Sequence, residues 1–145
     1  MVYNGISMKI KQISVFLEDS TTRLSELAET LARQGIDIKA ISFTETANMC
    51  ILRLIVSKCD EALTILNNAG FTTRVAEVSV VEIGNFPGSF ARLMELFEKN
   101  GVLVEYFYTA SKNIKDKAIF IFKFKNYQEG QRILEENGLI PAENL

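Results

Sequence analysis

Apolar residues along the chain follow two different periods, and the two periods alternate. Residues 11–18 carry Ile13, Val15 and Leu17 at every second position, which is typical of a strand with one buried face. The next segment, 22–34, spaces its apolar residues three and four apart, which predicts an amphipathic helix. The pattern continues with strands at 36–45 and 49–56, a helix at 57–69 and a strand from 71.

The chain then repeats this pattern at an offset of about 66 to 68 residues. The stretch 14–41 aligns with 80–107, so that Gly35 meets Gly101 and Leu31 meets Phe97. Internal repetition of this length indicates two copies of one structural unit. The second copy predicts strands at 78–83, 102–109 and 117–125, and helices at 88–100 and 127–137.

Each copy has the order β-α-β-β-α-β, the ferredoxin-like motif with an antiparallel sheet and both helices on one face. We therefore predict an α+β fold of two ferredoxin-like modules. Residues 71–83 serve both as the last strand of one copy and the first of the next, so no flexible linker separates them. The final strand, 139–145, contains Pro141 and is weak. The predicted division is a leader at 1–8, a first module at 9–77 and a second module at 78–145.

Some predicted strands are apolar on both faces. In the strand 117–125 the phenylalanines point to one side, whereas Ile119 and Ile121 point to the other. A sheet with one face in water alternates cleanly between apolar and polar residues. Either the second face packs on another element, or these strands are simply central in the sheet. We favour packing against another sheet through oligomerisation, and we expect a homodimer.

Composition and charge restrict the classes of partner. The chain has 145 residues, 48% of them hydrophobic, which suits one ordinary domain or two very small ones. Its net charge of −2 gives no electrostatic reason to expect nucleic acid or an anionic membrane as partner. No apolar run approaches the roughly 20 residues of a membrane span, and the N-terminus lacks the apolar core of a signal peptide. These features predict a cytoplasmic protein with neither nucleic acid nor membrane as partner.

Residue types that commonly carry catalysis or bind metals are scarce. Histidine is absent, which removes the commonest general base and the commonest metal ligand. The two cysteines, Cys50 and Cys59, fit no metal motif or disulfide framework and are interpreted as buried thiols. No hydrolase or phosphate-loop motif is present. We therefore predict a protein that is not an enzyme and that uses no metal and no cofactor.

The start of the second copy's first helix carries a distinctive turn, "NFPGSF" at 85–90. Gly88 would let a ligand approach the main chain, and Pro87 fixes φ where its missing N–H is harmless. A helix N-terminus offers unpaired N–H groups and partial positive charge to a carboxylate. The same residues also suit an ordinary turn in which Asn85 caps the helix. Both interpretations stay open.

Tandem modules of this order with an N-x-P-G-x-F junction resemble ACT domains, small regulatory modules that bind amino acids and related metabolites. The resemblance covers residues 9 to about 140. The second module fits the junction pattern throughout 85–90, whereas the first keeps Asp19 and Leu24 but lacks the Pro and Gly. The resemblance implies an amino acid held between a junction and the second strand of a neighbouring module, where the two second strands add edge to edge.

Candidate ligand-binding residues come from both junctions and from the two second strands. An Asp or Asn side chain would accept from an ammonium, hydroxyls and an Arg would hold a carboxylate, and aromatic rings would form the pocket wall. Aromatic residues in strands are also common in cores, and which junction binds stays open. The predicted set is Asn85, Phe86, Pro87, Gly88, Ser89, Phe90, Asp19, Ser20, Thr21, Thr22, Arg23, Leu24, Ile41, Phe43, Tyr106 and Tyr108.

Together these features predict a non-catalytic regulatory protein that senses a free amino acid at the interface between ACT-like modules. A ligand between modules would favour one packing, which a regulated enzyme would detect as a separate partner. The alternative is an interaction module without a small ligand, acting as a regulatory subunit through dimerisation or docking. An RNA-binding sheet of the same topology is disfavoured, because the chain is acidic and lacks the expected Gly-aromatic pairing.

Overall fold

The computed structural model of the chain describes residues 9–18, 20–112, 114–141 and 145. The predicted leader at 1–8, Asp19, and residues 142–144 of the predicted last strand lie outside the described residues. The elements are β1 (Ile10–Leu17), α1 (Ser20–Arg33), β2 (Ile38–Glu45), β3 (Cys50–Val56), α2 (Cys59–Asn68), β4 (Thr72–Gly84), α3 (Ser89–Lys99), β5 (Val104–Thr109), β6 (Lys117–Phe124) and α4 (Tyr127–Glu136).

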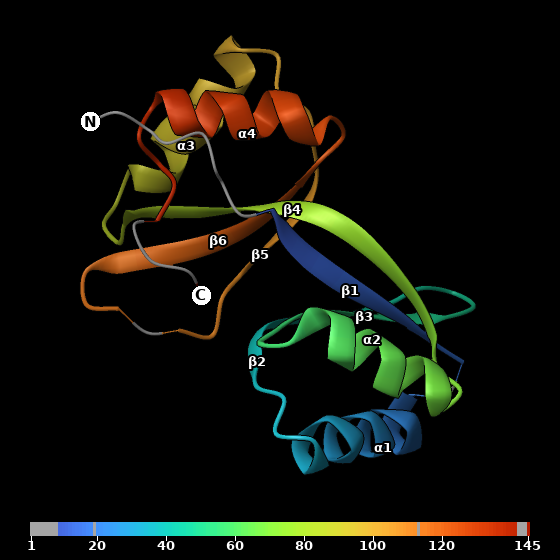
Figure 1. Cartoon of the computed structure of the whole chain (residues 1–145). Helices are drawn as coiled ribbons and strands as arrows, with labels where there is room; N and C mark the ends of the chain where they lie inside the picture. Colours follow the sequence, from blue (N-terminus) through green and yellow to red (C-terminus); the bar gives the residue numbers. More distant parts are fainter. Residues whose placement is uncertain (1–8, 19, 113, 142–144) are drawn as a thin grey trace.

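The strands form one antiparallel six-stranded sheet of order β2-β3-β1-β4-β6-β5. The sheet curls, and the α1–α2 pair and the α3–α4 pair lie on its opposite outer sides (Figure 1). Each half therefore has strands in ferredoxin-like order with both of its helices on one face. This confirms the predicted α+β fold of two ferredoxin-like modules.

The strand β4 belongs to both modules. Its first half, from Thr72 to Val78, pairs with β1, and its second half, from Ser79 to Gly84, pairs with β6. The two partner strands lie on opposite edges of β4. One continuous backbone thus runs from the first half of the sheet into the second, as the overlapping repeat predicts (Figure 1).

The second module has no counterpart of β4 among its described residues. After α4 the chain returns to the sheet through a hydrogen bond from the Glu82 N–H to the Leu139 carbonyl, at 3.1 Å. Pro141 follows two residues later and cannot donate to a ladder. The edge of β4 beside Glu82–Gly84 is consequently not covered by another strand of the described chain.

Three apolar cores hold the molecule together. The first two lie between each helix pair and its half of the sheet, and include Leu27, Leu31 and Leu66 in one half and Phe97, Phe122 and Leu134 in the other. The third lies on the inner face, between the two halves of the curled sheet. Its buried residues are Ala40, Ile55, Val78, Val80, Ile119 and Ile121.

The third core corrects the interpretation that oligomerisation covers the second sheet face. Ile119 and Ile121 are apolar because they pack against the other half of the same chain. Curling the sheet brings the two inner faces together, so a single chain supplies both sides of the packing. The two-faced apolar pattern of 117–125 therefore reports an internal core.

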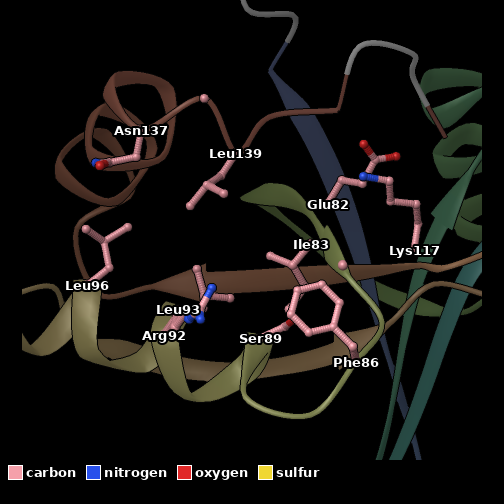
Figure 2. A pocket seen from close by; sticks show the side chains of 12 residues that line it. Glu82, Ile83, Phe86, Ser89, Arg92, Leu93, Leu96, Lys117, Asn137 and Leu139 are labelled. Carbon is pink, nitrogen blue, oxygen red and sulfur yellow. The ribbon is translucent and has the colours of Figure 1, made fainter.

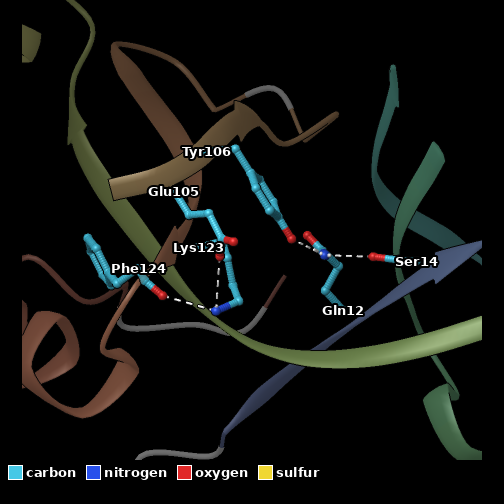
Figure 3. A network of polar contacts seen from close by, with 6 residues as sticks. All are labelled: Gln12, Ser14, Glu105, Tyr106, Lys123 and Phe124. Carbon is cyan, nitrogen blue, oxygen red and sulfur yellow. Dashed lines mark hydrogen bonds and ion pairs between the residues drawn. The ribbon is translucent and has the colours of Figure 1, made fainter. Parts of the chain in front are cut away.

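Polar side chains cross the same seam between the halves (Figure 3). Gln12 of β1 is fully buried; its amide donates to the Tyr106 hydroxyl at 2.6 Å and accepts from the Tyr108 hydroxyl at 2.7 Å. The Arg53 guanidinium lies over the Tyr106 ring, with its carbon 3.8 Å from the ring centroid. Burial, with a smaller contribution from Tyr106, raises the pKa of Tyr108, so this hydroxyl remains a donor. The network joins β5 of the second module to β1 and β3 of the first.

Candidate functional site

The second strand-to-helix junction, residues 85–90, links the end of β4 to the start of α3. Gly88 is the N-cap of α3 and has a φ of 94°, a left-handed conformation that residues with a Cβ rarely adopt. No heavy atom lies within 4 Å of the place where a Cβ of Gly88 would stand. The backbone conformation, rather than crowding, is therefore what requires glycine at this position.

No side chain caps the N-terminus of α3. Asn85 is exposed, and its backbone N–H donates to the Asp116 carbonyl at 2.9 Å. The Ser89 N–H donates to the Phe86 carbonyl at 3.2 Å, which leaves the next N–H groups of the first turn without a side-chain acceptor among the described residues. The predicted cap by Asn85 is therefore wrong, whereas Phe86–Ser89 do form an ordinary β-turn, closed by that hydrogen bond and with the positive φ of Gly88 at its third position.

A cavity of about 520 Å³ lies beside this junction (Figure 2). We call it the second-junction cavity. It opens between α3, the end of β4 and the segment that follows α4. Pockets that bind small molecules typically measure roughly 300–1,000 Å³, so this one is of suitable size. Its wall consists of Glu82, Ile83, Gly84, Phe86, Ser89, Arg92, Leu93, Leu96, Lys117, Asn137, Gly138 and Leu139.

Ser89 is the wall residue whose polar group most clearly lacks a partner. The residue is only 8% exposed, and its hydroxyl has no hydrogen-bond partner among the described residues. An unsatisfied buried hydroxyl costs about 1–3 kcal/mol. It stands in the first turn of α3, beside the uncapped N–H groups. Hydroxyl and helix N-terminus together offer donors and partial positive charge to an acceptor such as a carboxylate.

Three charged side chains share the wall with Ser89. Glu82 comes from β4, Arg92 from α3 and Lys117 from the start of β6. None of the ion pairs within the described ranges involves any of the three. Glu82 and Lys117 alternate with Ile83 and Ala118 of the second module's core, so their side chains point to the inner face of the sheet, and Arg92 is the charged residue on the α3 side of the cavity.

Aromatic residues of the junction divide between the cavity and the opposite side of α3. The Phe86 ring folds back over Gly84, where a Cβ would overlap it, and it lines the cavity while remaining 56% exposed. Phe90 points elsewhere and packs against Phe107 and Phe120, with ring centroids 5.4 and 5.5 Å apart. Of the predicted residues at 85–90, Phe86 and Ser89 line the cavity, whereas Asn85, Pro87, Gly88 and Phe90 do not.

The first junction carries different side chains at the equivalent positions. The repeat places Arg23 where Ser89 stands in the second module, and Phe71 where Leu139 stands. The Arg23 guanidinium lies over the Phe71 ring, 4.0 Å from its centroid, and pairs with Glu26 at 2.7 Å. Among the described residues, a cation–π contact and an ion pair therefore join the positions that border the cavity in the second module.

The remaining predicted residues of the first junction lie at the start of α1. Ser20, Thr21 and Thr22 open this helix, and Leu24 packs against the core of the first module. Asp19, predicted to accept from an ammonium, lies outside the described residues. The first junction thus contributes helix and core residues around the closed Arg23–Phe71 contact.

The predicted strand residues do not line the second-junction cavity. Ile41 and Phe43 are exposed on the edge strand β2. Tyr106 and Tyr108 face the inner seam, where their hydroxyls bond to Gln12. The structure therefore separates these residues into an outer edge and an inner seam.

The second strands of the two modules do approach each other, but only at one end. Ala40 of β2 and Ala110 beyond β5 form an isolated antiparallel bridge. Next to it, the Ser111 N–H and hydroxyl donate to the Lys39 carbonyl at 3.3 and 2.7 Å. The edge-to-edge pairing that the resemblance implies is thus reduced, within the chain, to this short contact.

Sequence reasoning missed the part of the wall that comes from other elements. Arg92 and Leu96 lie one and two turns further along α3, Lys117 begins β6, and Leu139 follows α4. A signal for the cavity was present in the repeat, where a large Arg and Phe in the first module meet a smaller Ser and Leu in the second. Recognising it requires knowing that these two positions touch.

Two absences apply to the described ranges, 9–18, 20–112, 114–141 and 145. No helix there is long and apolar enough to cross a membrane. The same residues hold no group of three or more His, Cys, Asp or Glu side chains placed to bind a metal ion.

Cys50 is buried and Cys59 half-buried, both as free thiols. Burial and the neighbouring Asp60 raise the pKa of Cys59.

Comparison with known proteins gives a family for the chain. The family model described as "ACT domain pair" matches residues 8–144. Among solved structures, the chain is similar to protein BT0572 from Bacteroides thetaiotaomicron, with 31% identity and a TM-score of 0.85 over 92% of this chain and 91% of that one. No curated protein matched the sequence.

Two aspartate kinase regulatory subunits share the fold. The one from Thermus thermophilus, in a ligand-free form, has 16% identity and a TM-score of 0.65 over 90% of this chain and 93% of that one. The one from Thermus flavus has 14% identity and a TM-score of 0.60, with the same shares of 90% and 93%. Likenesses at identities this low show a shared fold and nothing further.

Proposed function

Because the chain belongs to the ACT domain pair family, we propose that it is a non-catalytic regulatory protein that binds a free amino acid in its second-junction cavity. The observation that carries this proposal is the buried hydroxyl of Ser89, which lacks a partner and stands at an uncapped helix N-terminus that lines a cavity of about 520 Å³. The second junction is proposed as the site because Arg23, which lies over Phe71, takes the place of Ser89 in the first.

The start of α3 suits the carboxylate end of an amino acid. The ligand carboxylate would accept hydrogen bonds from the Ser89 hydroxyl and from N–H groups of the first turn of α3, with Arg92 on the same helix face, since residues three apart are neighbours there. Hydrogen bonds to charged groups contribute about 1.5–3 kcal/mol each, so these contacts would dominate recognition.

Ligand binding would change the packing of the second module. The cavity wall joins three elements that are not adjacent in sequence: α3, the end of β4 and the segment after α4. A ligand that contacts all three would favour the arrangement in which they lie together. A conformation is stabilised only by the difference in ligand affinity between two states, so a partner would detect this arrangement rather than the ligand itself.

The partner class we propose is a separate enzyme whose activity the protein regulates. The likeness in fold to regulatory subunits of aspartate kinase supports a subunit that acts on another chain. A homodimer is part of the proposal, because β2 and β5 are sheet edges that carry the exposed apolar residues Ile41, Phe43 and Phe107. Exposed strand edges of this kind favour pairing with another chain.

Calorimetric titration with the twenty amino acids tests the proposed function. We expect at least one to bind and to raise the melting temperature of the protein.

Ser89→Ala should lower the affinity for the ligand without lowering the stability of the unliganded protein. It removes an unsatisfied buried hydroxyl, so the unliganded protein should be as stable as the parent or more so, yet ligand affinity should fall by about tenfold. Ser25→Ala, at an exposed position of α1, is the matched control and should change neither.

Two results would overturn the proposal. Absence of heat and of any melting shift with all twenty amino acids would remove the ligand. Equal affinity of the parent and Ser89→Ala would remove the second-junction cavity as the site, even if some amino acid binds elsewhere.

A second candidate function is an interaction module without a small ligand. It is favoured by two exposed aromatic side chains that touch, Phe90 of α3 at 37% and Phe107 of β5 at 44%, with ring centroids 5.4 Å apart. Exposed apolar groups that lie together often mark protein contacts. This candidate predicts that the protein sediments as a dimer. It also predicts that no amino acid changes the stability of that dimer. Ligand-dependent melting would exclude it.

A further inference from the structure

The ammonium of an amino acid in the second-junction cavity needs an acceptor, and the uncovered edge of β4 offers one from its main chain. We infer that the ligand lies along this edge like a single residue of a parallel strand. Its ammonium donates to the Glu82 carbonyl, and its carboxylate accepts from the Gly84 N–H. The inference rests on the proposed function, because it assigns how the ligand of that same site is recognised.

Two hydrogen bonds fix the direction of the main-chain groups at the end of β4. The Glu82 N–H donates to the Leu139 carbonyl at 3.1 Å, on the edge of β4 away from β6. The Asn85 N–H donates to the Asp116 carbonyl at 2.9 Å, on the β6 side. Successive residues of a strand direct their N–H and C=O groups to alternate edges. The Glu82 carbonyl and the Gly84 N–H therefore both face away from β6.

No other strand of the described chain covers these two groups. The pairing of β1 with β4 stops at Val78, and Leu139 is the residue after α4 whose main chain bonds to this edge. In Figure 2 the end of β4 lies between Leu139 and Lys117 of β6, beside the cavity. Unpaired N–H and C=O groups on a strand edge are a template for a further hydrogen-bonded chain. The cavity thus contains a free strand edge as well as the start of α3.

A free α-amino acid has the two groups that this edge lacks, at the right separation. In a parallel ladder the N–H of one residue donates to a carbonyl of the neighbouring strand, and its carbonyl accepts from the N–H two residues further on. Glu82 and Gly84 are two residues apart, so an ammonium and a carboxylate on one α-carbon match them. The reverse orientation would bring the carboxylate against the Glu82 carbonyl, where two acceptors cannot bond.

This orientation agrees with the carboxylate site at the start of α3. The chain passes from Gly84 through the turn into α3, so the Gly84 end of the edge is the end nearer in sequence to Ser89. Both residues line the cavity. The Gly84 N–H, the unpartnered Ser89 hydroxyl and the uncapped first turn would then share one carboxylate. Strand edge and helix start become two walls of one site.

Recognition by a main-chain carbonyl has a chemical signature. The carbonyl needs a hydrogen-bond donor on the α-carbon of the ligand, and an ammonium or a hydroxyl supplies one, whereas a keto oxygen does not. Among ligands with one side chain, the amino acid should bind most tightly, the α-hydroxy acid next and the 2-oxo acid least. Recognition by charge alone would instead weaken the hydroxy acid and the oxo acid equally.

Calorimetric titration of the unaltered protein tests this order. The probes are the amino acid that binds most tightly among the twenty, together with the α-hydroxy acid and the 2-oxo acid that carry its side chain. We expect the hydroxy acid to bind about threefold to tenfold more tightly than the oxo acid. Equal affinities of these two acids would contradict a bond to the Glu82 carbonyl.

Amide hydrogen exchange measured by NMR tests the edge itself. Without ligand the Gly84 amide should exchange rapidly, because no strand of the described chain covers it. In a mixture of the twenty amino acids, at about a hundred times the dissociation constant of the tightest binder, its exchange should slow by up to about a hundredfold. Val75 is the matched control, since its N–H faces the opposite edge of β4 before the stretch that β6 covers. Its exchange should not change.

The outcomes separate this inference from the proposed function. Protection of Gly84 before any amino acid is added would show that the edge is already covered, and would overturn the inference. If Ser89→Ala weakens amino-acid binding while Gly84 still exchanges rapidly in the bound protein, the second-junction site stands and the strand edge is not part of it. If no amino acid binds the parent protein, the proposed function is wrong and the inference falls with it.

Discussion

The two strand-to-helix junctions occupy equivalent positions in a repeated unit, yet an Arg–Phe contact stands at one and a cavity at the other. In the first module Arg23 lies over Phe71 and pairs with Glu26. In the second module Ser89 and Leu139 take those two positions, and a cavity of about 520 Å³ lies between their elements. The comparison teaches that the presence of a cavity at such a junction can depend on the volume of two side chains while the backbone framework is shared.

The same comparison has an energetic side. A cation–π contact such as Arg23–Phe71 stabilises a fold by about 0.5–1 kcal/mol at an exposed position. The unsatisfied Ser89 hydroxyl instead costs about 1–3 kcal/mol. The described contacts of the first junction therefore contribute stability, whereas the second carries a cost that an acceptor for Ser89 would remove. Under the proposed function, a duplicated unit with one junction of each kind would keep its fold and still respond to a small molecule.

The largest effect should come from moving the packed corner into the second module. Ser89→Arg combined with Leu139→Phe places the Arg and Phe of the first junction at the hollow one. We expect amino-acid binding to fall by about a hundredfold or more, because the carboxylate site is filled and its donors are covered. Thermal melts of the unliganded protein should show unchanged or higher stability. Retained ligand-dependent melting would mean that the cavity is not the site.

A smaller effect should separate the two helix starts. Gly88→Ala should lower the free energy of unfolding by about 1–2 kcal/mol, because a Cβ is strained at a φ of 94°. Thr22 is the position in the first module that corresponds to Gly88, and it lies inside α1. Thr22→Ala should be nearly neutral, since alanine is a better helix former than threonine. Urea denaturation of both variants measures the difference. Equal losses would show that the two helix starts do not differ in backbone strain as described.

The smallest effect concerns the packed corner itself. Arg23→Ala removes the ring contact and the pair with Glu26, and should cost about 1 kcal/mol after allowance for the partial exposure of both charges. Arg33→Ala, which loses an exposed pair with Glu29 on the same helix but no ring contact, is the control and should cost only a few tenths. If the two variants are equally stable in chemical denaturation, the Arg23–Phe71 contact contributes nothing.

Sequence periodicity predicted the fold well, because each element depends on neighbours in the chain. The apolar spacing of 22–34 and the alternation of 11–18 correspond closely to α1 and β1. The overlap of the two copies at 71–83 correctly predicted one shared strand, β4. These predictions needed only local information and the repeat.

Features that depend on the curl of the sheet were not accessible in this way. Ile119 and Ile121 were interpreted as an oligomer interface, because periodicity gives the face of a residue but not what covers it. Tyr106 and Tyr108 were grouped with the junctions, whereas their register turns them to the inner seam beside Gln12. A third of the cavity wall comes from elements distant in sequence, such as Leu139 after α4, so only the fold could bring it to Ser89.

The thirteen residues of β4 have one more consequence, for any attempt to divide the protein. A cut before Thr72 would leave the β1 edge bare, and a cut after Gly84 would remove the strand on which β6 is built. Either fragment would expose unpaired main chain and tend to aggregate. Independent halves can be obtained only by encoding 72–84 in both pieces.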